Sequence, residues 1–213
     1  MPEASVGRSA LIEWGVATLA LPGEAQSGDR HLVKPLGTSV LLAVVDGLGH
    51  GAEAATAAQA AVAALERHAA ESPVRLIERC HRALQGTRGA VMSVALLGRP
   101  DRSMTWLGVG NVEGLLLHGD GVARSGSGRV SLVTRGGIVG SELPRLHPVV
   151  VPIAPGDMLI FATDGVREGF ADGLPPEAPA QQLADQILAR HGKGTDDALV
   201  LVARYRGGAG TRG

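Results

Sequence analysis

The order of the predicted helices and strands constrains the fold of this 213-residue chain most strongly. Turn residues separate many short apolar, β-branched segments, whereas apolar residues recur at helical spacing in only three places. The predicted helices cover residues 51–70, 73–85 and 179–192. The predicted strands cover residues 10–20, 31–34, 39–45, 90–98, 103–110, 113–119, 121–125, 146–153, 157–163 and 198–205.

Two consecutive helices followed by many strands differ from the regular strand–helix alternation of a doubly wound parallel sheet. The order favours an α+β fold in which two packed, mainly antiparallel β-sheets form a β-sandwich flanked by α-helices. No internal repeat or long linker divides the sequence. We therefore expect a single domain over residues 1–206, followed by a flexible C-terminal tail over residues 207–213.

Composition narrows the classes of function. Hydrophobic residues make up 45% of the chain, which is enough for a substantial core. The net charge of −1 and the aromatic content of 2% argue against a nucleic-acid partner. The lone cysteine, Cys80, excludes a disulfide scaffold, and its place in a predicted helix favours packing over catalysis. No apolar run is long enough for a signal peptide or a membrane span, so we expect a cytoplasmic protein without a membrane partner.

Acidic residues stand at the ends of several predicted strands. Asp46 and Asp164 each follow an apolar strand, Asp196 and Asp197 precede the last strand, and Asp29 precedes a short strand near the N-terminus. If the last strand runs antiparallel to the two apolar strands, its start lies at the same sheet edge as their ends. Converging carboxylates repel one another unless a cation neutralises them, and Mg²⁺ and Mn²⁺ prefer oxygen ligands. The pattern is therefore compatible with a metal cluster.

The glycines that follow these acids have two interpretations. Gly47 has no side chain, so its carbonyl group could approach a metal closely. However, Asp-Gly is also among the commonest turn dipeptides, and either motif alone predicts an ordinary turn. Two Asp-Gly motifs after apolar strands, with Asp-Asp before a third strand, leave a metal cluster and ordinary turns both open. His50, in the same glycine-rich stretch, stays unassigned between ligand, base and helix-capping roles.

Four motifs together resemble the metal-dependent serine/threonine phosphatases of type 2C, the PPM family. They are "SGD", "VVDGLGHG", "FATDGV" and "GTDDALVLV", which occur in the family's order over residues 27–202. More narrowly, they resemble the bacterial branch that includes SpoIIE. The stretches "AVVDGLGHG", "RGAVMSVALL" and "GVGNVEGLLL" resemble the stand-alone stressosome phosphatases of that branch. The resemblance implies a β-sandwich flanked by helices, with metal ions at one edge.

The resemblance also implies roles for individual residues. The implied metal ligands are Asp46, Gly47, Asp164, Asp196, Asp29 and Asp197. Asp46 would bridge two Mn²⁺ or Mg²⁺ ions, and Asp164 would hold the first of them, so both would act in catalysis through metal-bound water. Asp196 matches the family's acid before the last strand, and its neighbour Asp197 ranks second.

The activity implied by the resemblance is hydrolysis of phosphoserine or phosphothreonine on STAS-domain proteins of a stressosome, which would end a stress signal. One alternative is a pseudophosphatase that binds STAS-domain partners without turnover, and another is an unrelated metallohydrolase acting on small phosphoesters. No residue is assigned to substrate binding. Arg8 and Arg30 are the candidates for an N-terminal phosphate-binding arginine, and residues 127–145 are the candidate recognition loop.

Overall fold

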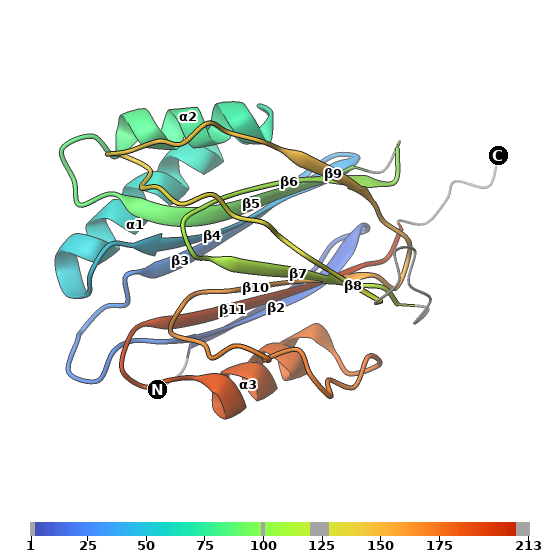
Figure 1. Cartoon of the computed structure of the whole chain (residues 1–213). Coiled ribbons are helices and arrows are strands. Elements are labelled where there is room, and N and C mark those ends of the chain that lie inside the picture. The colour runs from blue at the N-terminus through green and yellow to red at the C-terminus, as the bar shows by residue number, and fades with distance from the viewer. Residues whose placement is uncertain (1–2, 99–100, 120–127, 208–213) are drawn as a thin grey trace.

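The strands form two antiparallel sheets in a computed structural model that describes residues 3–98, 101–119 and 128–207. The six-stranded sheet contains, in spatial order, β1 (Glu3–Arg8), β2 (Ile12–Leu19), β11 (Ala198–Tyr205), β10 (Met158–Ala162), β7 (Glu113–Leu117) and β8 (Arg129–Ser131). The five-stranded sheet contains β3 (Asp29–Leu36), β4 (Ser39–Gly47), β5 (Ala90–Gly98), β6 (Ser103–Val109) and β9 (Val149–Pro152). The two sheets stack face to face (Figure 1), so the predicted sandwich is confirmed.

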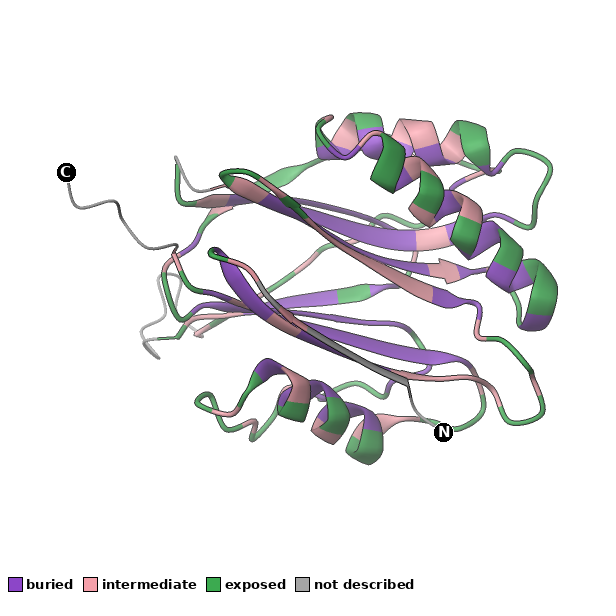
Figure 2. Cartoon of the chain, turned by 180° about the vertical axis from the view of Figure 1, so that it is seen from behind, coloured by how far each residue is buried: buried purple, intermediate pink, exposed green. Residues whose placement is uncertain are grey.

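Helices cover both outer faces of the sandwich (Figure 1). The helices α1 (Gly51–Arg67) and α2 (Pro73–Ala83) lie on the five-stranded sheet, and α3 (Ala180–His191) lies on the six-stranded sheet. The buried face of α1 is built largely from alanines such as Ala54, Ala58 and Ala61. Because alanine is small, the helix axis can approach the sheet closely. Figure 2 shows the result, with buried residues along the strands and exposed residues on the outer sides of the helices.

The strand β4 is covered on both faces, which explains its continuously apolar sequence. Leu42 and Val44 belong to the core between the two sheets. Leu41, Ala43 and Val45 belong to a second core, formed with residues of α1 and α2. Since both faces are buried, the strand shows no alternation of polar and apolar residues. Rigid packing on both sides fixes the position of the chain where the strand ends, at the first of the acidic motifs.

Two strands were not predicted from the sequence. The edge strand β1 has the polar sequence EASVGR and pairs with β2, from Glu3 opposite Thr18 to Arg8 opposite Glu13. The strand β8 has three residues, too few for a periodic signal. The predicted strand at 121–125 lies outside the described residues, as does 208–213 of the predicted tail. The division into a domain over 1–206 and a tail stays a prediction.

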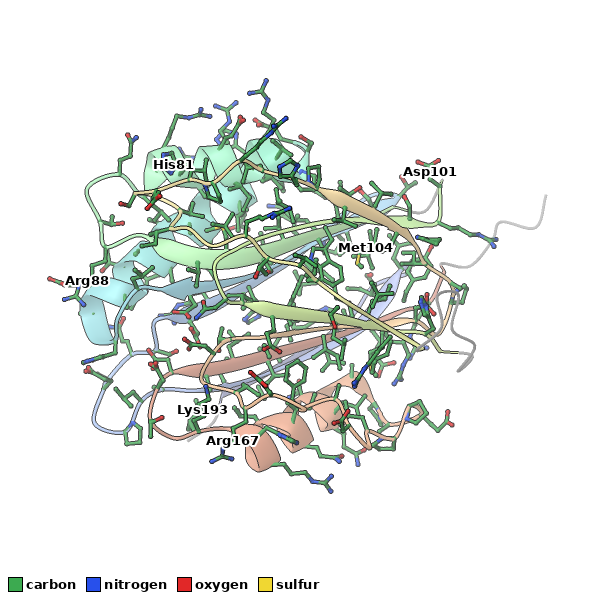
Figure 3. The ribbon with its side chains drawn as sticks, in the orientation of Figure 1. His81, Arg88, Asp101, Met104, Arg167 and Lys193 are labelled. Atoms are coloured by element: carbon green, nitrogen blue, oxygen red, sulfur yellow. The ribbon has the colours of Figure 1, made fainter. Side chains whose placement is uncertain are left out.

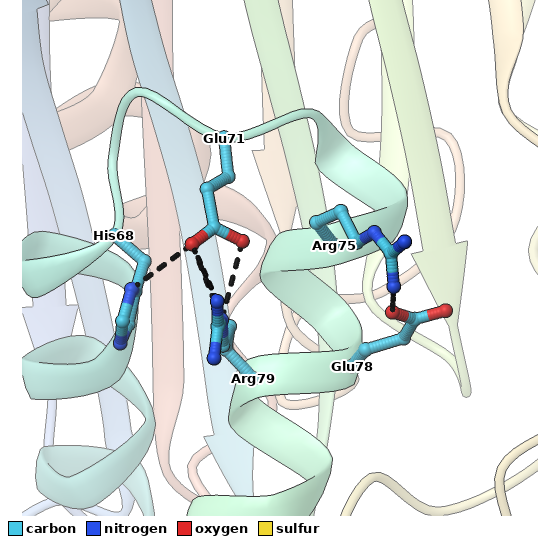
Figure 4. A network of polar contacts seen from close by, with 5 residues as sticks. All are labelled: His68, Glu71, Arg75, Glu78 and Arg79. Atoms are coloured by element: carbon cyan, nitrogen blue, oxygen red, sulfur yellow. Dashed lines mark hydrogen bonds and ion pairs between the residues drawn. The ribbon is translucent and has the colours of Figure 1, made fainter.

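A polar network holds the corner between α1 and α2 (Figure 4). The Glu71 carboxylate, in the turn between the helices, accepts hydrogen bonds from the Arg79 guanidinium, including one of 2.9 Å, and lies 3.1 Å from Nδ1 of His68. The Arg79 hydrogen bonds lower the pKa of Glu71. A separate pair, Arg75 and Glu78, lies on the surface of α2. Among the described residues, no helix is long and apolar enough to cross a membrane.

Candidate metal centre

The acidic residues converge from two sheets, so the prediction that they share one sheet edge holds for Asp164 and Asp196, beside the paired strands β10 and β11, and is wrong for Asp46. Asp46 belongs to β4 in the five-stranded sheet, whereas Asp164 follows β10 and Asp196 precedes β11 in the six-stranded sheet. The relevant ends of these strands lie at the same end of the sandwich. The acids therefore face one another across the space between the sheets. Sequence order could not reveal this, because it does not say which strands pair.

A cleft at this end of the sandwich brings three of the predicted residues together. Its lining consists of Asp46, Leu48, Gly49, His50, Val91, Gly110, Asn111, Gly136, Asp164 and Asp196. Asp46 and Asp196 are partly buried, and Asp164 is exposed. The cleft thus presents carboxylates contributed by three separate strand ends, in a setting that also contains apolar and amide side chains.

Asp29 lies buried behind the cleft. It is the first residue of β3 and stands opposite Asp46 in the register of β3 and β4. The Thr163 hydroxyl, at the end of β10, donates a 2.8 Å hydrogen bond to Oδ2 of Asp29. The same hydroxyl oxygen accepts a 2.8 Å hydrogen bond from the Leu199 amide of β11. Thr163 therefore links the two sheets directly beneath the acidic cleft.

Asp197 is also buried, but its carboxylate is occupied by backbone groups. Its Oδ1 accepts a hydrogen bond of 2.8 Å from the Leu21 amide, and its Oδ2 accepts one of 2.7 Å from the Gly28 amide. These contacts fix the loop between β2 and β3. Asp196 lines the cleft and Asp197 does not, which agrees with the order in which the sequence ranked the two acids.

Burial and mutual repulsion raise the pKa values of two of these acids. The pKa of Asp46 is raised to about 7, mainly by burial and also by the neighbouring carboxylates of Asp164, Asp196 and Asp197. The pKa of Asp29 is raised well above its ordinary value by burial and by Asp46. The hydrogen bond from Thr163 lowers it only in part. A cation placed among these carboxylates would relieve the repulsion.

The donor set is compatible with a hard divalent cation, although the side chains do not yet enclose one. In the part of the chain that the structure describes, no group of three or more His, Cys, Asp or Glu side chains is arranged to hold a metal ion. Some of the carboxylates are engaged elsewhere, such as Asp197 by backbone amides. The available donors are oxygens, which suit Mg²⁺ and Mn²⁺ better than Zn²⁺.

The glycines of the two Asp-Gly motifs are required by close backbone contacts. Neither Gly47 nor Gly165 has a positive φ, so neither forms a left-handed turn. A Cβ atom at Gly47 would collide with the Ala54 carbonyl of α1, and one at Gly165 would collide with the Asp197 carbonyl. Asp46 and Gly47 belong to β4, so the ordinary-turn interpretation is wrong for this motif. Asp164 and Gly165 do form an ordinary turn, closed by a 3.0 Å hydrogen bond from the Val166 amide to the Thr163 carbonyl. The proximity of the Gly47 carbonyl to a metal stays a prediction.

Two residues beside Asp164 were missed by the sequence analysis. The Asn111 side-chain amide donates a 2.8 Å hydrogen bond to Oδ2 of Asp164, and the Lys193 ammonium donates one of 2.5 Å to the Asp164 backbone carbonyl. Asn111 follows Gly110, whose φ of +93° sets the turn between β6 and β7. The sequence feature that could have indicated Asn111 was the glycine-rich stretch around it. Nothing in the sequence indicated Lys193.

His50, which the sequence left unassigned, contacts Glu24. It occupies the N-cap position of α1, although its side chain makes no capping hydrogen bond. Its Nδ1 lies 2.6 Å from Oε1 of Glu24, in the loop between β2 and β3. The Glu24 carboxylate also lies over the first residue of α1, where the helix dipole favours negative charge. His50 therefore lines the cleft, with its imidazole in contact with the Glu24 carboxylate.

The structure places the three candidates for substrate binding in different settings. Nη1 of Arg30 donates hydrogen bonds of 2.7 Å to the carbonyl oxygens of Ser27 and Asp29, so its guanidinium stabilises the local turn. The side chain of Arg8 lies outside the described part of the structure. In the candidate loop at 127–145, of which residue 127 is not described, Gly136 lines the cleft. Its role in recognition stays a prediction.

Comparisons with known proteins agree with this geometry. Residues 37–206 match the family model described as "Stage II sporulation protein E (SpoIIE)". The phosphoserine phosphatase RsbX of Bacillus subtilis (strain 168) is 34% identical over 145 residues, which cover 68% of this chain and 70% of RsbX. The match therefore extends over most of both proteins.

Solved structures show the same fold. RsbX in complex with magnesium superposes with a TM-score of 0.84 at 23% identity, covering 95% of this chain and 100% of that one. A chain from work described as "The bacterial stressosome: a modular system that has been adapted to control secondary messenger signaling" gives a TM-score of 0.81 at 33% identity, covering 91% and 99%. With the acidic cleft and the family match, these likenesses lead to one conclusion: the chain belongs to the SpoIIE family of PP2C-type phosphatase domains.

Proposed function

We propose that this protein is a metal-dependent serine/threonine protein phosphatase that dephosphorylates STAS-domain proteins of a stressosome and so ends a stress signal. The observation that carries the proposal is the cleft where Asp46, Asp164 and Asp196 meet from two sheets. Family membership supports phosphatase chemistry. The likeness to RsbX and to a chain from stressosome work supports phosphoserine or phosphothreonine on STAS-domain partners as the substrate.

Specific residues would hold the metal ions. Asp46 would bridge two Mn²⁺ or Mg²⁺ ions with help from the Gly47 carbonyl, while Asp164 and Asp196 would complete the set from the other sheet. Asp29 and Asp197 are further ligand candidates behind them. The magnesium complex of RsbX supports this choice of ion. When bound, such ions supply Lewis acidity and activate water near neutral pH.

The remaining contributions come from the chain itself. The Asn111 amide orients the Asp164 carboxylate through its 2.8 Å hydrogen bond. Leu48 and Val91 contribute apolar side chains to the lining of the cleft. Cys80 takes no part, because it is buried on α2 and burial raises the pKa of its thiol to about 12. The proposed hydrolysis therefore needs no thiol nucleophile.

Replacement of Asp46 tests the central role. Asp46→Asn keeps the size of the side chain but removes the negative charge, so we expect Mn²⁺-dependent hydrolysis of p-nitrophenyl phosphate to be lost while the far-UV circular dichroism spectrum is unchanged. Asp101→Asn is the matched control, because Asp101 is exposed and lies at the opposite end of the molecule from Arg88 and the start of α1 (Figure 3). Full activity of Asp46→Asn would contradict the bridging role.

Two measurements separate the alternative functions. A pseudophosphatase would bind a phosphorylated STAS-domain protein without releasing phosphate, whereas the proposed enzyme releases phosphate in single-turnover assays with Mn²⁺. A hydrolase of small phosphoesters would show a higher kcat/KM for small esters than for the phosphoprotein. The proposed function requires a higher kcat/KM for the phosphoprotein than for small esters. The cytoplasmic location stays a prediction, as does the absence of nucleic-acid and membrane partners.

A further inference from the structure

Arg88 lies in the connection between α2 and β5, at the same end of the molecule as the start of α1 (Figure 3). The neighbouring Gly89 carbonyl accepts a 3.1 Å hydrogen bond from the Leu48 amide, which ties this connection to the turn after β4. Gly49, in that turn, lines the cleft and has a φ of +87°. A Cβ atom at Gly49 would lie 2.5 Å from Nη1 of Arg88. The guanidinium therefore occupies the space that a side chain at Gly49 would fill.

Contacts on both sides hold Arg88 in this position. Its Nε lies 2.5 Å from Oε2 of Glu53, in the first turn of α1. The Thr87 hydroxyl donates a 2.7 Å hydrogen bond to the Leu84 carbonyl and accepts one of 3.0 Å from the Gly89 amide. The backbone before and after Arg88 is thus fixed. The ion pair uses the Nε edge of the guanidinium, and Nη1 lies over the cleft-lining turn.

The charge of the cleft creates a need for such a group. A phosphoryl dianion that enters a site lined by carboxylates meets repulsion, which bound metal ions would offset and a neighbouring cation would reduce further. Arg30 is committed to backbone carbonyls, and the Lys193 ammonium to the carbonyl of Asp164. A guanidinium presents paired N–H donors that match two phosphate oxygens. Arg88 combines this chemistry with a position beside Gly49, which lines the cleft.

We propose that Arg88 binds the phosphoryl group of the substrate and that Glu53 is the positioning residue that holds its guanidinium over Gly49. This inference rests on the proposed phosphatase function, since it assigns the phosphate-binding residue of the same site. The ligand is the phosphate dianion itself. Replacement of Arg88 should therefore weaken the binding of a phosphoprotein, a small phosphoester and inorganic phosphate to the same extent.

The test compares Arg88→Ala, Arg88→Lys and Glu53→Gln with the wild type in the presence of Mn²⁺. We expect Arg88→Ala to raise the inhibition constant of inorganic phosphate and the KM for p-nitrophenyl phosphate by about 10- to 100-fold, the range for a lost hydrogen bond to a charged group. Arg88→Lys should recover part of this loss, and Glu53→Gln should show a smaller loss. Mn²⁺ affinity, measured by calorimetry, should not change in Arg88→Ala.

Arg75→Ala is the matched control, because Arg75 is also an exposed arginine paired with a glutamate, on the surface of α2 (Figure 4). Its phosphate inhibition constant should equal that of the wild type. An unchanged phosphate inhibition constant in Arg88→Ala would overturn the inference, even if the KM for a phosphoprotein rose. If the wild type hydrolyses no phosphoester, the proposed function fails. Calorimetric binding of inorganic phosphate to the Mn²⁺-loaded protein then tests Arg88 separately.

Discussion

At the scale of single residues, the Asn111 side chain controls the orientation of an exposed acid. Asp164 is the most exposed of the three carboxylates in the cleft, so packing alone does not fix it. The 2.8 Å hydrogen bond from Asn111 supplies the missing restraint. Groups that orient a ligand in this way typically contribute 10- to 100-fold to metal affinity or activity. Asn111 is therefore as informative a target as the acids themselves.

We predict that Asn111→Ala lowers Mn²⁺ affinity or kcat by roughly 10- to 100-fold. The reason is that Asp164 then adopts several side-chain conformations, and only some of them face the cleft. Calorimetric titration with Mn²⁺ and steady-state hydrolysis of p-nitrophenyl phosphate measure the two quantities. Asn111→Gln, which keeps the amide, should lose less than Asn111→Ala. Equal values for wild type and Asn111→Ala would show that Asp164 needs no such restraint.

At the scale of secondary-structure elements, the site depends on how closely α1 approaches the end of β4. The Ala54 carbonyl of α1 occupies the position that a side chain at Gly47 would take. The same relation holds between Gly165 and the backbone of Asp197, at the start of β11. In both Asp-Gly motifs the glycine allows a second backbone segment to pack directly against the acid-bearing one. The acids are therefore held by packed elements.

We predict that Gly47→Ala lowers the free energy of unfolding by about 1–3 kcal/mol, because the added methyl group forces α1 away from β4. Denaturation in urea measures this loss. Gly98→Ala is the control, since Gly98 also lies in a strand, has no positive φ, and the nearest atom to an added Cβ is 4.0 Å away. The control should stay within about 0.5 kcal/mol of the wild type. Similar stabilities for both variants would contradict the packing argument.

The sequence predicted the elements well where burial is regular, and poorly where contacts are long-range. The continuously apolar strand ending at Asp46 and the helical spacing of the following alanines are both local patterns, and both appear as predicted. The assignment of Asp46 to the other sheet depends on strand pairing, which local patterns do not encode. The links from Asn111 to Asp164 and from Arg88 to Glu53 join residues far apart in sequence, so spacing could not reveal them.

At the scale of the whole molecule, the acidic cluster places carboxylates from both sheets close together, where their negative charges repel. Asp29 and Asp46 belong to one sheet, and Asp164, Asp196 and Asp197 border the strands of the other. Hydrophobic burial between the sheets holds these groups together although their charges repel. Without metal ions, the fold therefore carries an electrostatic cost at this end of the sandwich. A bound cation would convert that repulsion into a bridge between the sheets.

This electrostatic cost predicts that the stability of the metal-free protein depends on pH. Asp46 has an ordinary pKa of 3.8 that rises to about 7 in the folded chain, so the folded state binds the proton more tightly than the unfolded state. Stability is then highest below pH 4 with respect to this group, and is lost as pH rises toward 7. Between pH 5 and pH 8 the loss spans about two pKa units, or up to roughly 3 kcal/mol. The raised pKa of Asp29 acts in the same direction.

Urea denaturation in EDTA at pH 5 and pH 8 measures the effect, with Asp46→Asn as the variant that lacks the titrating group. We expect the variant to be more stable than the wild type at pH 8, and the difference to shrink at pH 5. Asp101→Asn should keep the pH dependence of the wild-type stability, because Asp101 is exposed at the far end of the sandwich. Added Mn²⁺ should stabilise the wild type most at pH 8, above the pKa of about 7 of Asp46, and stabilise Asp46→Asn far less. An Asp46→Asn variant less stable than the metal-free wild type at pH 8 would mean that the carboxylate of Asp46 stabilises the fold, and that the cluster needs no cation to offset its charge.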